Sequence, residues 1–293
     1  MYSEEGRENK PITWRELLRE TAKRFEGAQV PESELDAWYL MEACFSIDRS
    51  WFFLHGAETV KKDEAYERFL ALAKRREKRE PLQYLLGEQM FMGLPFSVNE
   101  SVLIPRQDTE CLVELVLKDC GKKSLRLLDM CTGSGCILLS LLHYGDFSYG
   151  LGVDLMEDAL AVARENACRL ALPAEFIQSD LFENLPPVTF DVIVSNPPYV
   201  TGEEMKTLEP EVLEHEPHTA LYAPENGLVF YKRLAAKSGD WLKGGGRIYL
   251  EIGYRQGPEV KALLEQAGFA QVQVHKDLAG LDRVVSAIKP MDE

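Results

Sequence analysis

Cysteine is scarce in this chain and widely spaced. The 293 residues include six cysteines, and none shows the Cys-x-x-Cys or Cys/His spacing of a zinc site. Six scattered thiols are also too few for the disulfide framework of a secreted scaffold. We therefore predict no metal site, and reduced thiols in a cytosolic protein.

Long apolar runs are absent as well. No window approaches the run of about 20 apolar residues that a transmembrane helix needs. The first ten residues, MYSEEGRENK, are too acidic and polar for a signal peptide. The sequence thus predicts a cytoplasmic protein without a membrane partner.

Positive charge is in deficit. The chain has 33 Lys and Arg against 48 Asp and Glu, a net charge of −15. Proteins that grip a phosphate backbone usually have a basic face, so the balance argues against a direct nucleic-acid substrate. It favours a protein or a small cationic ligand as the partner. The remaining composition, 45% hydrophobic and 28% charged, is that of a globular protein, and the length suits two domains.

The first 86 residues are predicted to form a helical domain. Thr13 and Glu16 have the spacing of a capping box, and apolar positions after them repeat with a helical period. Further helices are expected over 32–46 and 62–79. The charged run over 74–79 is either a phosphate-binding strip or a solvated helix end, and we favour the second interpretation because cations suit a helix C-terminus.

The rest of the chain changes character. Residues 87–105 combine alternating apolar residues with glycine and proline, which predicts a β-hairpin linker. From 106 to 293, strand patterns alternate with helical ones. Strands are expected over 125–129, 149–153, 174–178, 190–194, 247–252, 270–275 and 283–288, and helices over 107–120, 136–142, 158–170, 226–242 and 258–267. Such alternation predicts an α/β fold with a mainly parallel sheet covered by helices on both faces.

Acidic side chains and glycines follow three successive strands. Gly133 and Gly135 allow a tight turn after the first strand, Asp154 ends the second, and Asp180 follows the third. Each feature alone has a structural alternative, a plain turn or a helix cap. Together they predict a site for adenosine, with Asp154 on the ribose and Asp180 near the adenine amino group. The third glycine of a dinucleotide fingerprint is missing, so a cofactor without a pyrophosphate, such as S-adenosyl-L-methionine, fits better.

The fourth strand runs into Asn196-Pro197-Pro198-Tyr199. Two prolines fix the backbone and remove two N–H donors, so this loop is stiff and its carbonyls stay free to accept. The side-chain oxygen of Asn196 and the carbonyl of Pro197 suit the two hydrogens of one planar NH2 group, and Tyr199 suits its flat face. The tetrapeptide predicts a clamp for an amide or an aromatic amine.

These motifs resemble the HemK/PrmC family of peptide chain release factor N5-glutamine methyltransferases. The resemblance covers nearly the whole chain, and it also rests on segments outside the cofactor turn: 81–87, 91–96, 103–110, 216–217, 250–256 and 277–283. It implies a class I methyltransferase fold, with a Rossmann-like, mainly parallel seven-stranded sheet over 106–293. It also implies a small N-terminal domain over 1–86 for substrate recognition.

The resemblance further implies a reaction and its residues. The methyl group of S-adenosyl-L-methionine passes to the side-chain amide nitrogen of glutamine in a Gly-Gly-Gln motif, leaving S-adenosyl-L-homocysteine. The expected catalytic residues are Asn196, Pro197 and Tyr199, and the expected substrate-binding residues are Asn196, Pro197, Pro198 and Tyr199. The expected cofactor-binding residues are Cys131, Thr132, Gly133, Ser134, Gly135, Asp154, Asp180, Leu181 and Asn196.

The chain departs from the family pattern at a few positions, and two rival activities stay open. Cys131 stands where many relatives have glycine, and Leu181 where some have an aromatic residue. Arg106 and Glu251 either shape the site or form a core-edge acid and its partner. The rivals are an N6-adenine nucleic-acid methyltransferase and a glutamine methyltransferase acting on a ribosomal protein; the acidic catalytic half argues against the first. We expect a monomer whose N-terminal helices contact the release factor.

Overall fold

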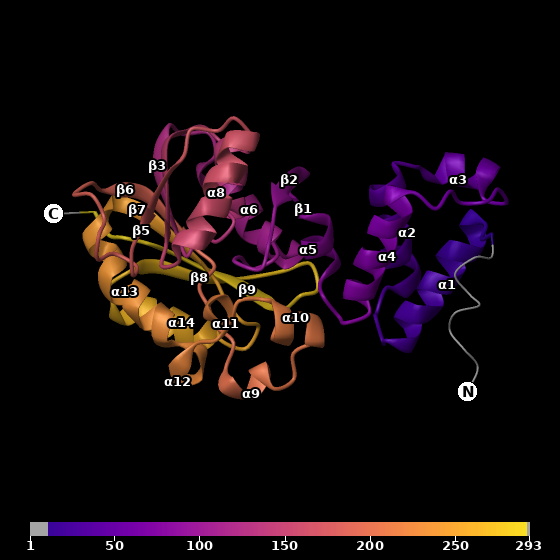
Figure 1. Ribbon diagram of the computed structural model, residues 1–293. Helices are drawn as coiled ribbons and strands as arrows, with labels where there is room; N and C mark the ends of the chain where they lie inside the picture. The colour runs from indigo at the N-terminus through magenta and orange to yellow at the C-terminus, as the bar shows by residue number, and fades with distance from the viewer. Residues whose placement is uncertain (1–10, 292–293) are drawn as a thin grey trace. The chain divides into compact units, whose positions relative to one another are not determined.

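The computed structural model describes residues 11–291, which form two compact units that divide between Leu86 and Gly87 (Figure 1). The acidic opening segment that argued against a signal peptide, residues 1–10, lies outside the described residues. None of the helices within 11–291 is long and apolar enough to cross a membrane.

The N-terminal unit is helical, as predicted. Its helices are α1 (Trp14–Gly27), α2 (Ser33–Phe45), α3 (Arg49–His55), α4 (Glu64–Arg76) and α5 (Leu82–Leu86). The predicted capping box is confirmed, because Thr13 and Glu16 each bind the other's backbone N–H through a side-chain oxygen. The apolar faces of α1, α2 and α4 meet in a core of their own that includes Phe25, Leu40 and Phe69.

One cation of the charged run at the end of α4 is not solvated. Arg76 is 5% exposed, and its Nε donates to Oδ2 of Asp36 on α2 across 2.7 Å. Arg76 follows Phe69 and Ala73 at helical spacing, so it lies on the buried face of α4. The interpretation of this run as a solvated helix end is therefore wrong for Arg76, where a buried carboxylate compensates the charge.

The second unit begins with an antiparallel hairpin and is built around a seven-stranded sheet. The hairpin strands are β1 (Glu88–Phe91) and β2 (Leu94–Ser97). The sheet strands are β3 (Leu125–Met130), β4 (Phe147–Asp154), β5 (Glu175–Gln178), β6 (Phe190–Ser195), β7 (Leu242–Glu251), β8 (Ala270–Lys276) and β9 (Asp282–Ile288). Their order is β5-β4-β3-β6-β7-β9-β8, and only the pairs of β9 with β7 and β8 are antiparallel. The predicted mainly parallel α/β fold is confirmed.

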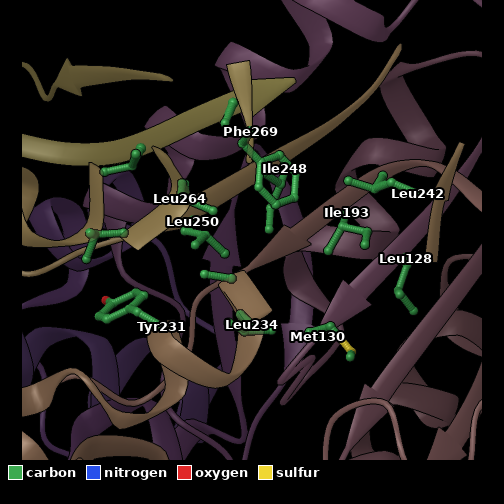
Figure 2. Packing of buried hydrophobic residues seen from close by; sticks show 14 of the residues in the cluster. Leu128, Met130, Ile193, Tyr231, Leu234, Leu242, Ile248, Leu250, Leu264 and Phe269 are labelled. Carbon is green, nitrogen blue, oxygen red and sulfur yellow. The ribbon is translucent and has the colours of Figure 1, made fainter. Parts of the chain in front are cut away.

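Helices cover both faces of this sheet because its strands are apolar on both sides. Alternate residues of β3 separate the two cores, with Leu127 in one and Leu128 in the other. The helices with residues in the Leu127 core are α6 (Gln107–Cys120), α7 (Cys136–Tyr144) and α8 (Glu157–Arg169), and those in the Leu128 core are α13 (Val229–Trp241) and α14 (Gly257–Gln266). Figure 2 shows the Leu128 core, to which Ile193 and Ile248 from neighbouring strands and Leu234 of α13 all belong.

Four short helices between β6 and α13 were not predicted. They are α9 (Gly202–Met205), α10 (Pro210–His215), α11 (His218–Leu221) and α12 (Pro224–Gly227). The long helix expected over 226–242 begins only at Val229, because Glu225, Asn226 and Gly227 have positive φ angles of 54°, 55° and 80°. Left-handed backbone cannot continue a right-handed helix, so these residues form a separate turn.

Candidate active site

A cavity lies at the carboxyl ends of β3, β4, β5 and β6. β3 has β4 on one side and β6 on the other, so the chain changes direction across the sheet here, which is where open α/β sheets bind ligands. Of the residues expected at the site, those that line the cavity are Cys131, Thr132, Gly133, Ser134, Asp154, Asp180, Leu181, Asn196 and Pro198. Gly135, Pro197 and Tyr199 do not line it.

The turn after β3 is held by hydrogen bonds to its neighbours. The N–H of Thr132 donates to the carbonyl of Val153 across 2.9 Å, and its hydroxyl donates to Oδ2 of Asp129 across 2.6 Å. Gly133 and Gly135 have φ angles of 54° and 78°, which glycine adopts without strain. Cys131 has a φ of 59° without being glycine. The turn thus takes an unusual backbone path at three residues out of five.

Gly135 has a second role that its φ angle does not explain. A Cβ at this position would lie 3.3 Å from Cβ of Ala163 and 3.3 Å from Cδ1 of Leu139. Glycine therefore allows α7 to begin close against α8. The residue supports the cavity from behind, although it does not line it.

Asp154 joins the glycine turn to the start of α8. Its Oδ2 accepts from the N–H of Gly133 across 2.9 Å, and its Oδ1 accepts from the N–H of Met156 across 3.0 Å. Burial raises the pKa of this carboxyl, and the bonds from Met156 and Gly133 partly offset the rise. The helix-cap role and a ligand role are compatible here, because each carboxylate oxygen has a second lone pair.

Asp180 has a cationic neighbour that the sequence did not reveal. Nη2 of Arg233, from α13, lies 2.8 Å from Oδ1 of Asp180. Leu181 beside it is 6% exposed and has a φ of 53°. The ion pair orients the Asp180 side chain, and Leu181 gives the same end of the cavity an apolar wall.

Asn196 is oriented by a residue from another element. Its Nδ2 donates to Oγ1 of Thr109 across 3.3 Å. Thr109 lies in the first turn of α6 and also lines the cavity. Because the amide nitrogen faces Thr109, the amide oxygen of Asn196 faces the other way.

Tyr199 lies behind the cavity wall, against an acid. Its hydroxyl donates to Oε1 of Glu251 across 3.4 Å, and the carbonyl of Tyr199 accepts from Nε2 of Gln256 across 3.2 Å. Burial and the Glu251 carboxylate both raise the pKa of Tyr199. Gln256 also accepts from the N–H of Gly253 across 2.9 Å, so it ties the end of the Asn-Pro-Pro-Tyr loop to the segment after β7.

Glu251 is a buried carboxyl close to this loop. It is 2% exposed, and burial raises its pKa to about 7, while its polar neighbours Thr109, Arg283 and Tyr199 favour the ionised form. Within residues 11–291, Oε2 has no hydrogen-bond partner of ordinary geometry. Such an acid titrates near neutral pH.

Arg106 pairs with Glu216 and not with Glu251. The guanidinium of Arg106 donates to Oε1 of Glu216, and the N–H of Ile104 donates to Oε2 across 3.1 Å. Glu216 is only 4% exposed, and each of its two carboxylate oxygens accepts a hydrogen bond from one of these donors. The interpretation of Arg106 as a partner of Glu251 is therefore wrong; Arg106 instead fixes the segment before α6 to the segment after α10.

Asn166 also supports the site, although the sequence analysis missed it. This buried asparagine of α8 donates from Nδ2 to the carbonyl of Ser134 across 2.9 Å. Its Oδ1 accepts from the N–H of Ser97 across 2.7 Å, which links β2 to the glycine turn. The sequence feature that could have revealed this role is an asparagine on the apolar face of a predicted helix.

The described residues hold no group of three or more His, Cys, Asp and Glu side chains suited to a metal ion. The polar groups at the cavity are instead amides, hydroxyls, thiols, single carboxylates and the guanidinium of Arg106. The site therefore has the means to bind and orient a ligand by hydrogen bonds.

Comparisons with known proteins agree over both units. The family model described as PrmC N-terminal domain matches residues 16–87, and the Methyltransferase small domain matches residues 107–220. A release factor glutamine methyltransferase from Cereibacter sphaeroides is 39% identical over 277 residues, covering 94% of this chain and 98% of that protein. Its counterpart from Geobacter sulfurreducens is 36% identical over 278 residues, covering 94% and 97%.

A solved structure shares the fold. The methyltransferase from Pyrococcus furiosus superposes with a TM-score of 0.54 at 17% identity, covering 77% of this chain and 98% of that one. At that identity the likeness concerns the fold alone. Identity along nearly the whole length of the curated relatives is the stronger finding: the chain belongs to the family of release factor glutamine methyltransferases.

Proposed function

We propose that this protein transfers a methyl group from S-adenosyl-L-methionine to the side-chain amide nitrogen of the glutamine in the Gly-Gly-Gln motif of peptide chain release factors. One observation carries the proposal. Asp154, the last residue of β4, and Asn196, the first residue after β6, line the same cavity. An acceptor for a ribose and an acceptor for a planar NH2 group are thus brought together.

The turn after β3 fits a cofactor without phosphates. A pyrophosphate site presents backbone N–H groups to the ligand. Here the N–H of Gly133 is bound to Asp154, and the N–H of Gly135 is bound to the carbonyl of Thr132 across 2.8 Å. The carboxylate of Asp154 instead places negative charge in the wall, which suits a cation.

Different residues of the cavity would contact different parts of the cofactor. Cys131, Thr132, Gly133 and Ser134 would border the methionine part, Asp154 would accept from the ribose, and Asp180 and Leu181 would border the adenine. When bound, S-adenosyl-L-methionine supplies an electrophilic methyl group on a sulfonium. These assignments rest on the cavity lining and the resemblance.

The Asn-Pro-Pro-Tyr loop would hold the substrate amide. An amide nitrogen is a weak nucleophile because its lone pair is delocalised, so orientation matters more than acid–base chemistry. Oδ1 of Asn196 and the carbonyl of Pro197 would accept both N–H groups and stabilise the positive charge that develops on nitrogen. As the N–CH3 bond forms, the S–CH3 bond would break to leave S-adenosyl-L-homocysteine, and the nitrogen would release one of its two protons. Well-oriented reactants gain up to roughly 7–11 kcal/mol. Pro198 and Tyr199 would keep this loop in place.

The partner and the setting follow from the same proposal. The N-terminal unit, which matches the PrmC N-terminal domain, would contact the release factor. With a net charge of −15 the chain is poorly suited to a nucleic-acid substrate, and we propose a protein substrate only. We further propose that the enzyme acts in the cytoplasm as a monomer.

A transfer experiment separates this function from its rivals. The purified protein receives methyl-labelled S-adenosyl-L-methionine and, in separate reactions, a release factor, ribosomal proteins, DNA or RNA. We expect label on the release factor alone, and none when its Gly-Gly-Gln glutamine is changed to glutamate. Label on a nucleic acid or on a ribosomal protein would overturn the proposal.

A further inference from the structure

We propose that Thr109 and Glu251 are positioning residues that determine which end of the Asn196 amide faces the substrate. The inference rests on the proposed function and deepens it. It assigns a role to two buried residues, Thr109 of α6 and Glu251 of β7, to which the proposed function has so far given none.

The need for such a device comes from the chemistry of a primary amide. The side chain of Asn196 has an acceptor end and a donor end of nearly the same shape, and a half-turn exchanges them. Only the oxygen end accepts from a substrate NH2 group, whereas the nitrogen end would place two donors against two donors. The orientation of Asn196 therefore decides whether the clamp works.

Thr109 supplies the partner that selects one orientation. Its Oγ1 lies 3.3 Å from Nδ2 of Asn196 and accepts from it. Thr109 is 2% exposed, so no bulk water competes for this position. If the amide turned over, Oδ1 would face Thr109 and Nδ2 would face the cavity.

Glu251 decides whether the Thr109 hydroxyl accepts or donates toward Asn196. A hydroxyl has one proton, and Oε2 of the buried Glu251 carboxyl has no hydrogen-bond partner within residues 11–291, so it is open to a donor. Among the neighbours that favour the ionised form of Glu251, Thr109 has the largest effect. An ionised carboxylate only accepts, so it would draw the proton of Thr109 toward itself and leave a Thr109 lone pair for Asn196. A protonated Glu251 would donate instead, which would release the Thr109 proton toward Asn196 and favour the wrong orientation.

The surroundings of Glu251 set its ionisation. Groups from five parts of the unit face this residue: Asp108 (α6), Cys136 (α7), Tyr199 (the loop after β6), Tyr231 (α13) and Arg283 (β9). Tyr199 and Arg283 favour the carboxylate, and Asp108 opposes it. Tyr231 donates to the Glu251 carbonyl across 2.8 Å, which fixes the backbone from which the carboxyl projects.

Each decisive variant changes one group of the Thr109 side chain. Thr109→Val keeps the shape of the side chain and removes the hydroxyl, whereas Thr109→Ser keeps the hydroxyl. We expect Thr109→Val to lower kcat for release-factor methylation about tenfold or more, and Thr109→Ser to stay within about threefold of wild type. Calorimetric affinity for S-adenosyl-L-methionine should stay within about threefold for both, since the hydroxyl acts on Asn196.

A double variant tests whether Thr109 acts through Asn196. If it does, Thr109→Val should add little to the loss caused by Asn196→Ala. A loss that multiplies in full in the Asn196→Ala background, or a Thr109→Val enzyme within about twofold of wild type, would overturn the inference.

The pH profile of kcat provides the second readout. Wild-type kcat should rise with pH as Glu251 ionises, and Glu251→Gln should remove this rise. If Thr109→Val does not fold, the Glu251→Gln profile decides, and a rise unchanged from wild type would overturn the inference. A wild-type enzyme that leaves the release factor unmethylated would instead overturn the proposed function, which distinguishes the two failures.

Discussion

The backbone N–H of Gly133 donates to Oδ2 of Asp154 across 2.9 Å, so the turn after β3 is tied to the end of β4. The same carboxylate caps the approach to α8 through Met156. Removing the side chain at position 154 would therefore disturb the turn as well as any ligand. A test of its ligand role has to keep the acceptor and remove the charge.

Asp154→Asn comes nearest to this: it removes the charge and keeps the shape and one of the two acceptor oxygens, while its NH2 group faces the N–H of Gly133 or of Met156. We expect the affinity for S-adenosyl-L-methionine to fall by roughly 1.5–3 kcal/mol, the scale of a hydrogen bond to a charged group. Titration calorimetry measures this directly. The control is Asp158→Asn. Asp158 is an exposed residue in the first turn of α8, so this variant should bind the cofactor as wild type does. Equal affinity in the Asp154→Asn and Asp158→Asn proteins would reject the ribose role.

Asn196→Ala should separate turnover from cofactor binding. We expect turnover to fall by on the order of 100-fold or more, because the substrate amide loses an oriented acceptor. Cofactor affinity should survive, since Asp154 and the glycine turn remain intact. The matched control is Asn184→Ala, an exposed asparagine outside the cavity lining. If Asn196→Ala turns over as fast as this control, the clamp assignment fails.

Glu251→Gln should change how stability depends on pH. The native pKa of Glu251 is about 7, above its ordinary 4.5, so the folded state binds the proton more tightly than the unfolded state. Wild type therefore loses stability as pH rises from about 4.5 through 7, by on the order of 3 kcal/mol from this group. Glutamine is neutral at every pH, so the free energy of unfolding of the Glu251→Gln protein should increase relative to that of wild type as pH rises.

Chemical denaturation at pH 5 and pH 8.5 measures that gain. Asp129, whose pKa burial also raises to about 7, is common to both proteins and cancels in the difference. A stability difference that is the same at both pH values would show that Glu251 does not titrate in this range.

Gly227→Ala should destabilise the protein for two reasons: the positive φ angle of this residue and a steric overlap of the added Cβ with its neighbours. A Cβ there would overlap the carbonyl oxygen of Tyr199 and Nε2 of Gln256. Gly280 has the same φ of 80° with nothing within 4 Å of a Cβ. We expect Gly280→Ala to lose about 1–2 kcal/mol of stability, the cost of left-handed backbone. Gly227→Ala should lose clearly more and should also slow turnover, since Tyr199 must move.

Thermal unfolding and kinetics of the two alanine variants make this comparison. Similar stability losses with unchanged turnover would mean that the Tyr199 carbonyl relaxes at little cost. The Asn-Pro-Pro-Tyr loop would then depend less on Gln256 than the structure indicates.

Strand ends were the most predictable part of the fold and the site. Apolar runs alternating with helical patterns indicated a parallel sheet, and parallel strands bring their carboxyl ends to one edge. The presence of Gly133, Asp154 and Asn196 at one edge of the sheet follows from that rule. The position of β6 beside β3, which brings Asn196 to the same cavity as the glycine turn, was not predicted.

Contacts between distant side chains were not predictable from the sequence. Thr109 and Asn196 are 87 positions apart, and Arg106 and Glu216 are 110 apart, with no shared period to connect them. The short helices between β6 and α13 were missed because each is at most six residues long, too short for a periodic signal. Tyr199 was expected at the substrate face, but its hydroxyl lies against a buried acid whose burial depends on the tertiary fold.

Fragment-ion mass spectrometry of a methylated release factor tests the central claim most directly. After incubation with wild-type protein and labelled S-adenosyl-L-methionine, the fragments should place one methyl group on the side-chain nitrogen of the glutamine in Gly-Gly-Gln. The Asn196→Ala protein should leave that glutamine unmodified over the same time. A methyl group on any other atom, or an equal yield from both proteins, would contradict the account.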